Sequence, residues 1–182
     1  MSAVARTLGR EELASLVCST LDEHGIRVVL SGGAAASIYA PNAYESMDLD
    51  FIQIGLFRKV DAAMQTLGFR KDKGRHWTHT ESEFWVEFPP GPVEIGDSVV
   101  HEFAERETPQ GTLRILTPTD SAMDRLAWFY HSNDVQGLQQ ALAIARSHPI
   151  DLPRVEAWSL NEGAQEKFER FFRSLEAAHG GD

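Results

Sequence analysis

Two aspartates, Asp48 and Asp50, have the spacing that most directly indicates chemistry in this sequence of 182 residues. They alternate with the apolar residues Leu49 and Phe51, which is typical of a strand that is buried on one face. Because side chains alternate along a strand, both carboxylates are predicted to lie on the same face. Like charges held side by side repel each other, and a divalent cation such as Mg²⁺ removes that repulsion by binding carboxylate oxygens. The pair therefore predicts a metal site.

The stretch upstream of this pair has the features of an anion site. An apolar β-branched run at 28–30 predicts a buried strand, and Ser31, Gly32 and Gly33 follow it. The next residues, 34–39, predict a short helix. Backbone N–H groups at glycines and the positive end of a helix both favour a bound anion such as phosphate. For the two glycines, close packing of the helix on a strand is the alternative interpretation, and Ser31 could either donate to a phosphate oxygen or cap the helix.

The strand, the glycine pair, the short helix and the Asp-x-Asp strand together resemble the nucleotidyltransferase superfamily related to DNA polymerase β. The resemblance is strongest to small bacterial members of the toxin–antitoxin and abortive-infection type, and it covers residues 26–88. Two features depart from the pattern. Many members carry a serine after the first glycine, whereas Ser31 precedes the pair here. Members with an Arg-x-Thr-x-Asp-x-Asp approach have Arg and Thr where this chain has Tyr44 and Ser46, so a basic phosphate contact is missing.

The superfamily also places a third carboxylate on a later strand, and Glu87 in Phe-Trp-Val-Glu-Phe fits that position. Glu83 shares the face of Glu87 and is an alternative, and Glu94 is a further one. In several members a basic group of a C-terminal helix contacts the nucleotide phosphates. The resemblance gives Arg125 that role, although charged rows on helices are commonly solvated faces.

The resemblance implies metal-dependent transfer of an NMP from an NTP to a hydroxyl group of a protein, an RNA end or a small molecule. Asp48 and Asp50 would hold Mg²⁺ or Mn²⁺, with Glu87 as a third ligand or as the base. The alternative is a catalytically inactive nucleotide-binding or protein-interaction module of the same fold. Such a module would have an operon-encoded protein partner, for example within a toxin–antitoxin pair.

Composition limits the partners and the compartment. With 27 acidic and 17 basic residues, the formal net charge of −10 argues against broad affinity for nucleic acid. A basic turn at 70–75, with Arg70, Lys71, Lys73 and Arg75, is interpreted either as a solvated hairpin tip or as a phosphate contact. The single cysteine, Cys18, cannot form an internal disulfide, so a cytoplasmic protein is expected. No apolar run is long enough to predict a membrane partner.

The elements predict an α+β fold with a small mixed β-sheet, flanking helices and a C-terminal helical extension. Strands at 28–30, 49–52 and 85–88 are expected to be central neighbours. The sequence Thr117-Pro118-Thr119-Asp120 predicts a helix start. We expect a nucleotidyltransferase-like core over residues 1–116 and a helical extension over 117–178 that packs on it. The other expected elements are helices at 10–24 and 57–67 and strands at 93–95, 99–103 and 113–116.

Overall fold

The computed structural model describes residues 8–72 and 75–177, and within these ranges the protein has an α+β fold. Lys73 of the basic turn lies outside the described residues. The main sheet has seven strands, which in spatial order are β3 (Arg70–Lys71), β4 (Trp77–Thr78), β5 (Trp85–Glu87), β2 (Asp48–Gln53), β1 (Val28–Ser31), β9 (Gly111–Leu116) and β8 (Phe103–Thr108). A second sheet has two strands, which are β6 (Glu94–Ile95) and β7 (Ser98–Val99).

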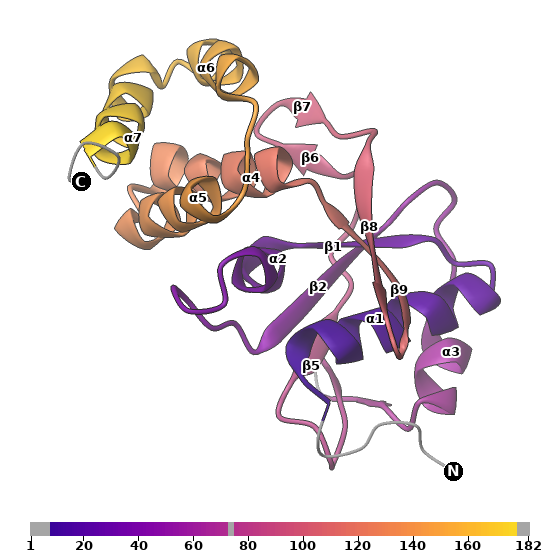
Figure 1. The fold of residues 1–182 in the computed structure, drawn as a ribbon. Helices are drawn as coiled ribbons and strands as arrows, with labels where there is room; N and C mark the ends of the chain where they lie inside the picture. Colours follow the sequence, from indigo (N-terminus) through magenta and orange to yellow (C-terminus); the bar gives the residue numbers. More distant parts are fainter. Residues whose placement is uncertain (1–7, 73–74, 178–182) are drawn as a thin grey trace.

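Helices α1 and α2 pack on the strands of the main sheet, and α4 to α7 follow one another to the C-terminal end (Figure 1). They are α1 (Arg10–Glu23), α2 (Gly32–Tyr39), α3 (Asp61–Thr66), α4 (Pro118–Ser132), α5 (Val135–Ser147), α6 (Leu152–Asn161) and α7 (Gln165–Ala177). In the described part of the chain, the length and hydropathy of each helix fall short of what a membrane crossing requires.

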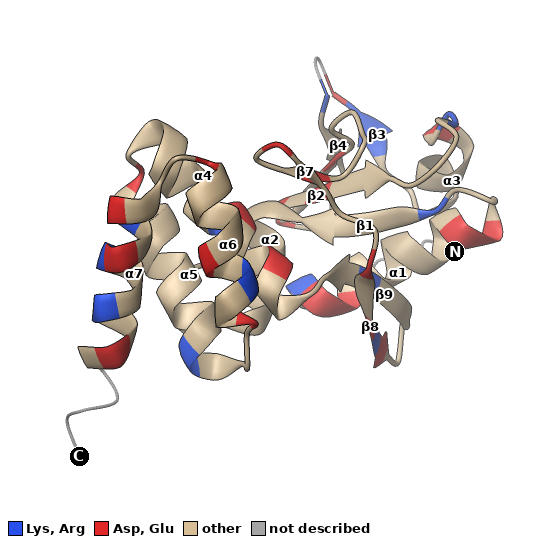
Figure 2. Cartoon of the chain, turned by 90° about the horizontal axis from the view of Figure 1, so that it is seen from above, with Lys and Arg blue, Asp and Glu red and all other residues tan. Residues whose placement is uncertain are grey.

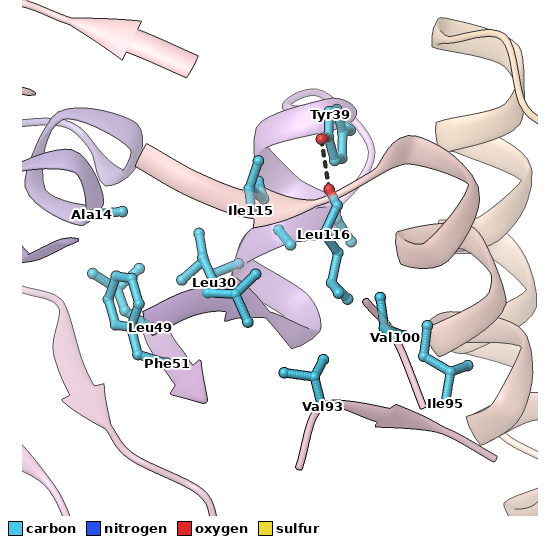
Figure 3. Packing of buried hydrophobic residues seen from close by; sticks show 14 of the residues in the cluster. Ala14, Leu30, Tyr39, Leu49, Phe51, Val93, Ile95, Val100, Ile115 and Leu116 are labelled. Carbon is cyan, nitrogen blue, oxygen red and sulfur yellow. Dashed lines mark hydrogen bonds between the residues drawn. The ribbon is translucent and has the colours of Figure 1, made fainter. Parts of the chain in front are cut away.

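The centre of the sheet is formed by the three strands that the sequence predicts as neighbours. Strand β1 pairs antiparallel with β2, and β2 pairs in parallel with β5. The face that carries Leu30, Leu49 and Phe51 is fully buried, and Figure 3 shows these side chains together with Ala14 of α1. Alternation of apolar and polar residues therefore fixes which face of β2 enters the core and which face carries the carboxylates.

The helical part begins where the sequence predicts it. Thr117 accepts a hydrogen bond from the backbone N–H of Asp120 at 3.1 Å, and Pro118 is the first residue of α4. From there α4 packs on α2, and Trp158 of α6 donates to the carbonyl oxygen of Ile95 at 3.3 Å. Tyr39, the last residue of α2, donates to the carbonyl oxygen of Leu116 at 2.7 Å (Figure 3). These contacts join the helices to the sheet, and the division into units at 1–116 and 117–178 stays a prediction.

The structure corrects the predicted helix at 57–67. Helix α3 covers only Asp61–Thr66, because the buried side chain of Gln53 binds Arg58, in the first turn of the predicted helix. Gln53 accepts from the backbone N–H of Arg58 and donates to its carbonyl oxygen, each at 2.9 Å. This pair of hydrogen bonds fixes the segment before α3 in a non-helical conformation.

The strand predicted at 99–103 is also wrong. Residue 99 ends β7, and β8 begins at Phe103 and continues to Thr108. Strand β8 owes its length to antiparallel pairing with β9 across the turn from Thr108 to Gly111. Its own sequence, Phe-Ala-Glu-Arg-Glu-Thr, has too few apolar residues to predict a strand without that partner.

Candidate metal and nucleotide site

Strands β1, β2 and β5 bring the predicted carboxylates to one face of the sheet. Asp50 is the register partner of Ser31 on β1 and of Glu87 on β5, and Asp48 pairs with Trp85. Directly paired residues on neighbouring strands point to the same face, so Asp48, Asp50 and Glu87 share it. We call this half-buried face of β2 and β5, defined by those three residues, the acidic face. The register brings Glu87 to Asp50, whereas Glu83 precedes β5 and Glu94 lies in the separate sheet.

The two aspartates have no directly bound cation in the described part of the chain. Among the described residues, neither carboxylate has a hydrogen bond or an ion pair. Burial, together with the charges of Glu87 and Asp48, raises the pKa of Asp50 to about 6, against the smaller opposing effect of Arg125. Burial and Glu87 also raise the pKa of Asp48, and His76 lowers it. The acidic face therefore carries carboxylates whose charged forms are disfavoured until a cation reaches them.

Glu87 is turned toward the edge of the sheet. Its carboxylate forms an ion pair with Nε2 of His76, which precedes β4. Within 8–72 and 75–177, no three His, Cys, Asp or Glu side chains are gathered closely enough to hold a metal ion as they stand. His76 was not predicted as part of the site. The signal for it was the hairpin register, because Trp77 pairs with Val86 and so puts His76 on the face of Glu87.

The glycine pair lies directly against the acidic strand. Gly32 opens α2 with φ of +68°, and a Cβ atom built there would lie 2.8 Å from Oδ2 of Asp50. A Cβ on Gly33 would lie 3.2 Å from the side chains of Ser46 and Tyr44. Close packing of the helix on the strand is therefore one reason for both glycines. The same packing brings the first turn of α2 to the carboxylate of Asp50.

Ser31 and Arg125 border the site in different ways. The Ser31 hydroxyl donates to the carbonyl oxygen of Asp50 at 3.4 Å, and it makes no capping hydrogen bond to α2. Arg125 lies on α4, where it donates to Asp124 at 3.1 Å and to Gln140 at 3.4 Å. Asp124 raises the pKa of Asp50 and Arg125 lowers it, so both charges lie within electrostatic reach of the acidic face. Asp124 belongs to the charged row on the helix of Arg125, which is commonly a solvated face, and so it was not predicted as part of the site.

The residues of the acidic face fit a hard divalent cation with an oxygen-rich ligand. Carboxylate oxygens are the ligands that Mg²⁺ takes, usually one or two of them together with phosphates of a substrate. Trp85, on the same face beside Asp48, has a buried indole Nε1 without a hydrogen-bond acceptor in the described part of the chain. A buried donor without an acceptor is costly, and an oxygen atom of a bound ligand would satisfy it.

Comparison with known proteins gives one similar solved structure. No family model matches the chain, and no curated protein matches it. The solution structure of the antibiotic-resistance factor ANT(2'')-Ia, 14% identical in sequence, aligns over 95% of this chain and 97% of its own, with a TM-score of 0.48. Likeness at this level does not transfer a chemistry, so the function proposed below comes from this chain's own side chains.

Proposed function

We propose that this protein is a metal-dependent nucleotidyltransferase, which moves an NMP from an NTP to an acceptor hydroxyl of a protein, an RNA end or a small molecule. The observation that carries the proposal is the acidic face, where two aspartates without a cation partner lie beside the glycine start of α2. A metal site beside an anion site at the start of a helix fits a metal-bound triphosphate. The single buried cysteine, Cys18, is in keeping with a cytoplasmic setting.

Each residue has a role that follows from its position. Asp48 and Asp50 would hold the divalent cations, and the backbone N–H groups of Gly32 and Gly33 would bind the phosphates. When bound, Mg²⁺ or Mn²⁺ supplies charge neutralisation for an in-line displacement at the α-phosphorus. Glu87, which contacts His76, would act as a third ligand or would accept the proton of the acceptor hydroxyl once that contact is released.

Arg125 and Ser31, which border the acidic face, would orient the nucleotide. Arg125 is held by Asp124 and Gln140, so its guanidinium has a defined position from which it can contact a phosphate. Ser31 is held by its hydrogen bond to the carbonyl oxygen of Asp50, and it lies at the junction of β1 and α2. A phosphate oxygen within reach of its hydroxyl could compete for that donor.

The proposal predicts labelling of an acceptor from α-labelled NTP. The purified protein should transfer label from at least one NTP, with release of pyrophosphate, to itself or to a component of a cell extract. Transfer should need Mg²⁺ or Mn²⁺ and should stop with a chelator, because like-charged carboxylates cannot hold a triphosphate without a cation. The measurement is separation of labelled RNA, protein and small molecules after incubation with each NTP.

Two variants control this experiment. Asp48→Asn should abolish the labelling, whereas Asp61→Asn, which removes the same charge from an exposed position on α3, should leave it unchanged. Metal-dependent nucleotide binding without pyrophosphate release from any NTP would instead assign the inactive nucleotide-binding module. The proposal is refuted if the protein shows no binding of any NTP and no transfer from any NTP.

A further inference from the structure

A hollow of about 630 Å³ lies on the side of the sheet opposite to the acidic face. Its place follows from the register, because Trp77 pairs with Val86 and both belong to the buried face of β4 and β5. The hollow reaches from Gln53, at the far end of β2 from Asp48, to the hairpin of β3 and β4. Its volume is ordinary for a small-molecule site. The side chains that matter here are Phe57, Lys59, Lys71, Arg75, Trp77 and Phe88.

The hollow is basic in an acidic protein. Among the described residues that line it, Lys59, Lys71 and Arg75 are basic and Asp61 alone is acidic, although the chain has a net charge of −10. Figure 2 shows the basic residues on β3 and on the segment that leads into α3. Within the described ranges, none of the three cations forms an ion pair with a carboxylate.

Several arginines elsewhere in the described chain are paired with carboxylates. Arg106 pairs with Glu11, Arg114 with Asp22, and Arg154 with Asp120. In a chain with an excess of acids, cations that converge on a hollow without acidic partners indicate an anionic ligand.

The hollow also presents aromatic surface. Phe57 is 77% exposed, and its position does not depend on a loose loop, because Gln53 binds both backbone groups of the following Arg58. Phe88 is half-buried and stacks on Phe51 of the core, with ring centroids 6.3 Å apart. Lys71 Nζ lies over the ring of Trp77, 5.9 Å from its centroid, and none of the three cations has a carboxylate partner in the described ranges. An exposed phenyl ring on a fixed backbone, beside such cations, is the combination on which nucleobases stack while their phosphates bind Lys and Arg.

We infer that this hollow is a second nucleotide-binding site, separate from the acidic face, that takes a base on Phe57 and phosphate at Lys59, Lys71 and Arg75. The ligand is a nucleotide unit, either free or as part of a single-stranded nucleic acid. The site uses no metal, since its charges are already positive. It therefore goes beyond the proposed transfer reaction and does not depend on it. An acidic peptide would satisfy the cations but would make no use of the exposed ring.

The test is fluorescence anisotropy with a labelled single-stranded oligothymidylate at low salt, in the presence of a chelator. We expect the probe to bind. The logarithm of its association constant should fall linearly with the logarithm of the salt concentration, with a slope of about −2 for three phosphate contacts. Lys59→Gln/Arg75→Gln should weaken binding about ten-fold or more and bring the slope to about −0.7, the value for one phosphate contact. Phe57→Ala should weaken binding by a similar factor through lost stacking. All three positions are exposed, so folding should be preserved.

Matched controls remove the same groups elsewhere. Arg146→Gln/Arg173→Gln removes two exposed charges from the C-terminal helices, and Leu160→Ala removes an apolar side chain that is 50% exposed. Both should bind as the wild-type protein does. Asp48→Asn should also bind as the wild type, which separates this site from the proposed transfer site.

Competition identifies the source of the nucleotide. Displacement of the probe by ATP in the chelator supports a site for a free nucleotide, and displacement by unlabelled oligomer alone supports a site for a nucleic-acid chain. The inference is overturned if the probe does not bind, or if the Gln pair and Phe57→Ala bind it as tightly as the controls. It is equally overturned if polyglutamate displaces the probe as well as the oligomer does, because the ligand is then an acidic protein segment.

Discussion

Replacement of Asp50 by Asn is expected to leave the fold at least as stable as that of the wild-type protein and to abolish transfer. The pKa of Asp50 is raised to about 6, so its charged form is disfavoured in the folded state at neutral pH. Removing that charge should raise the free energy of unfolding by about 1 kcal/mol, after allowance for solvent screening. Loss of one metal ligand should lower the transfer rate by at least about 100-fold. Urea unfolding and the labelling assay measure the two effects.

The opposite signs of these two effects make the prediction specific. Substitution of a residue that serves the fold should lower both the stability and the activity of the protein. Substitution of a metal ligand in a repulsive cluster should raise the stability and lower the activity. Asp61→Asn serves as the control for both measurements, because it changes an exposed charge outside the acidic face. An Asp50→Asn protein that retains transfer, or that is clearly destabilised, would contradict the role given to this residue.

Stability of the metal-free protein should depend on pH through the same residue. Asp50 has its pKa raised from 3.8 to about 6 by burial and by the charges of Glu87 and Asp48. Between these two values the folded state holds a proton that the unfolded state has lost, so the contribution of Asp50 to stability is full below about pH 4 and declines as pH rises toward 6. The expected decline is about 1–2 kcal/mol.

The measurement for this prediction is the difference in unfolding free energy between Asp50→Asn and the wild type, from pH 4 to pH 8 with a chelator present. The difference should favour the variant increasingly as pH rises through this window and should level off above it. Taking the difference cancels the titration of carboxylates far from Asp50, and what remains is the titration of the acidic face. A difference that stays constant across the window would mean that Asp50 titrates normally and that the acidic face is not a repulsive cluster.

The carboxylate pair could be predicted from the sequence because its information is local. Alternation of Asp48 and Asp50 with Leu49 and Phe51 determines a common face whatever the partner strands are. The third carboxylate could not be chosen in this way. Whether Glu83, Glu87 or Glu94 comes next to Asp50 depends on the register between strands far apart in the chain, and the parallel pairing of β2 with β5 selects Glu87.

The helix and the strand whose bounds were predicted wrongly depend on contacts between segments far apart in the sequence. Residues 57–60 have a helical pattern, yet they are not helical. Two hydrogen bonds between the buried side chain of Gln53 and the backbone of Arg58 keep this segment in another conformation. Strand β8 forms because β9 offers it a partner, which its own composition does not reveal. The contributions of His76 and Asp124 to the field at the acidic face arise in the same way, since each comes from an element that the sequence separates from β2.

The central claim is that the acidic face binds a divalent cation and a triphosphate together, and calorimetric titration tests it most directly. An α,β-methylene NTP should be titrated into wild-type protein, Asp48→Asn and Asp50→Asn, with Mg²⁺ and with a chelator. We expect saturable one-site binding to the wild type only when Mg²⁺ is present, and none to either variant. Binding of equal strength in the chelator, or Mg²⁺-dependent binding that both variants retain, would contradict the claim.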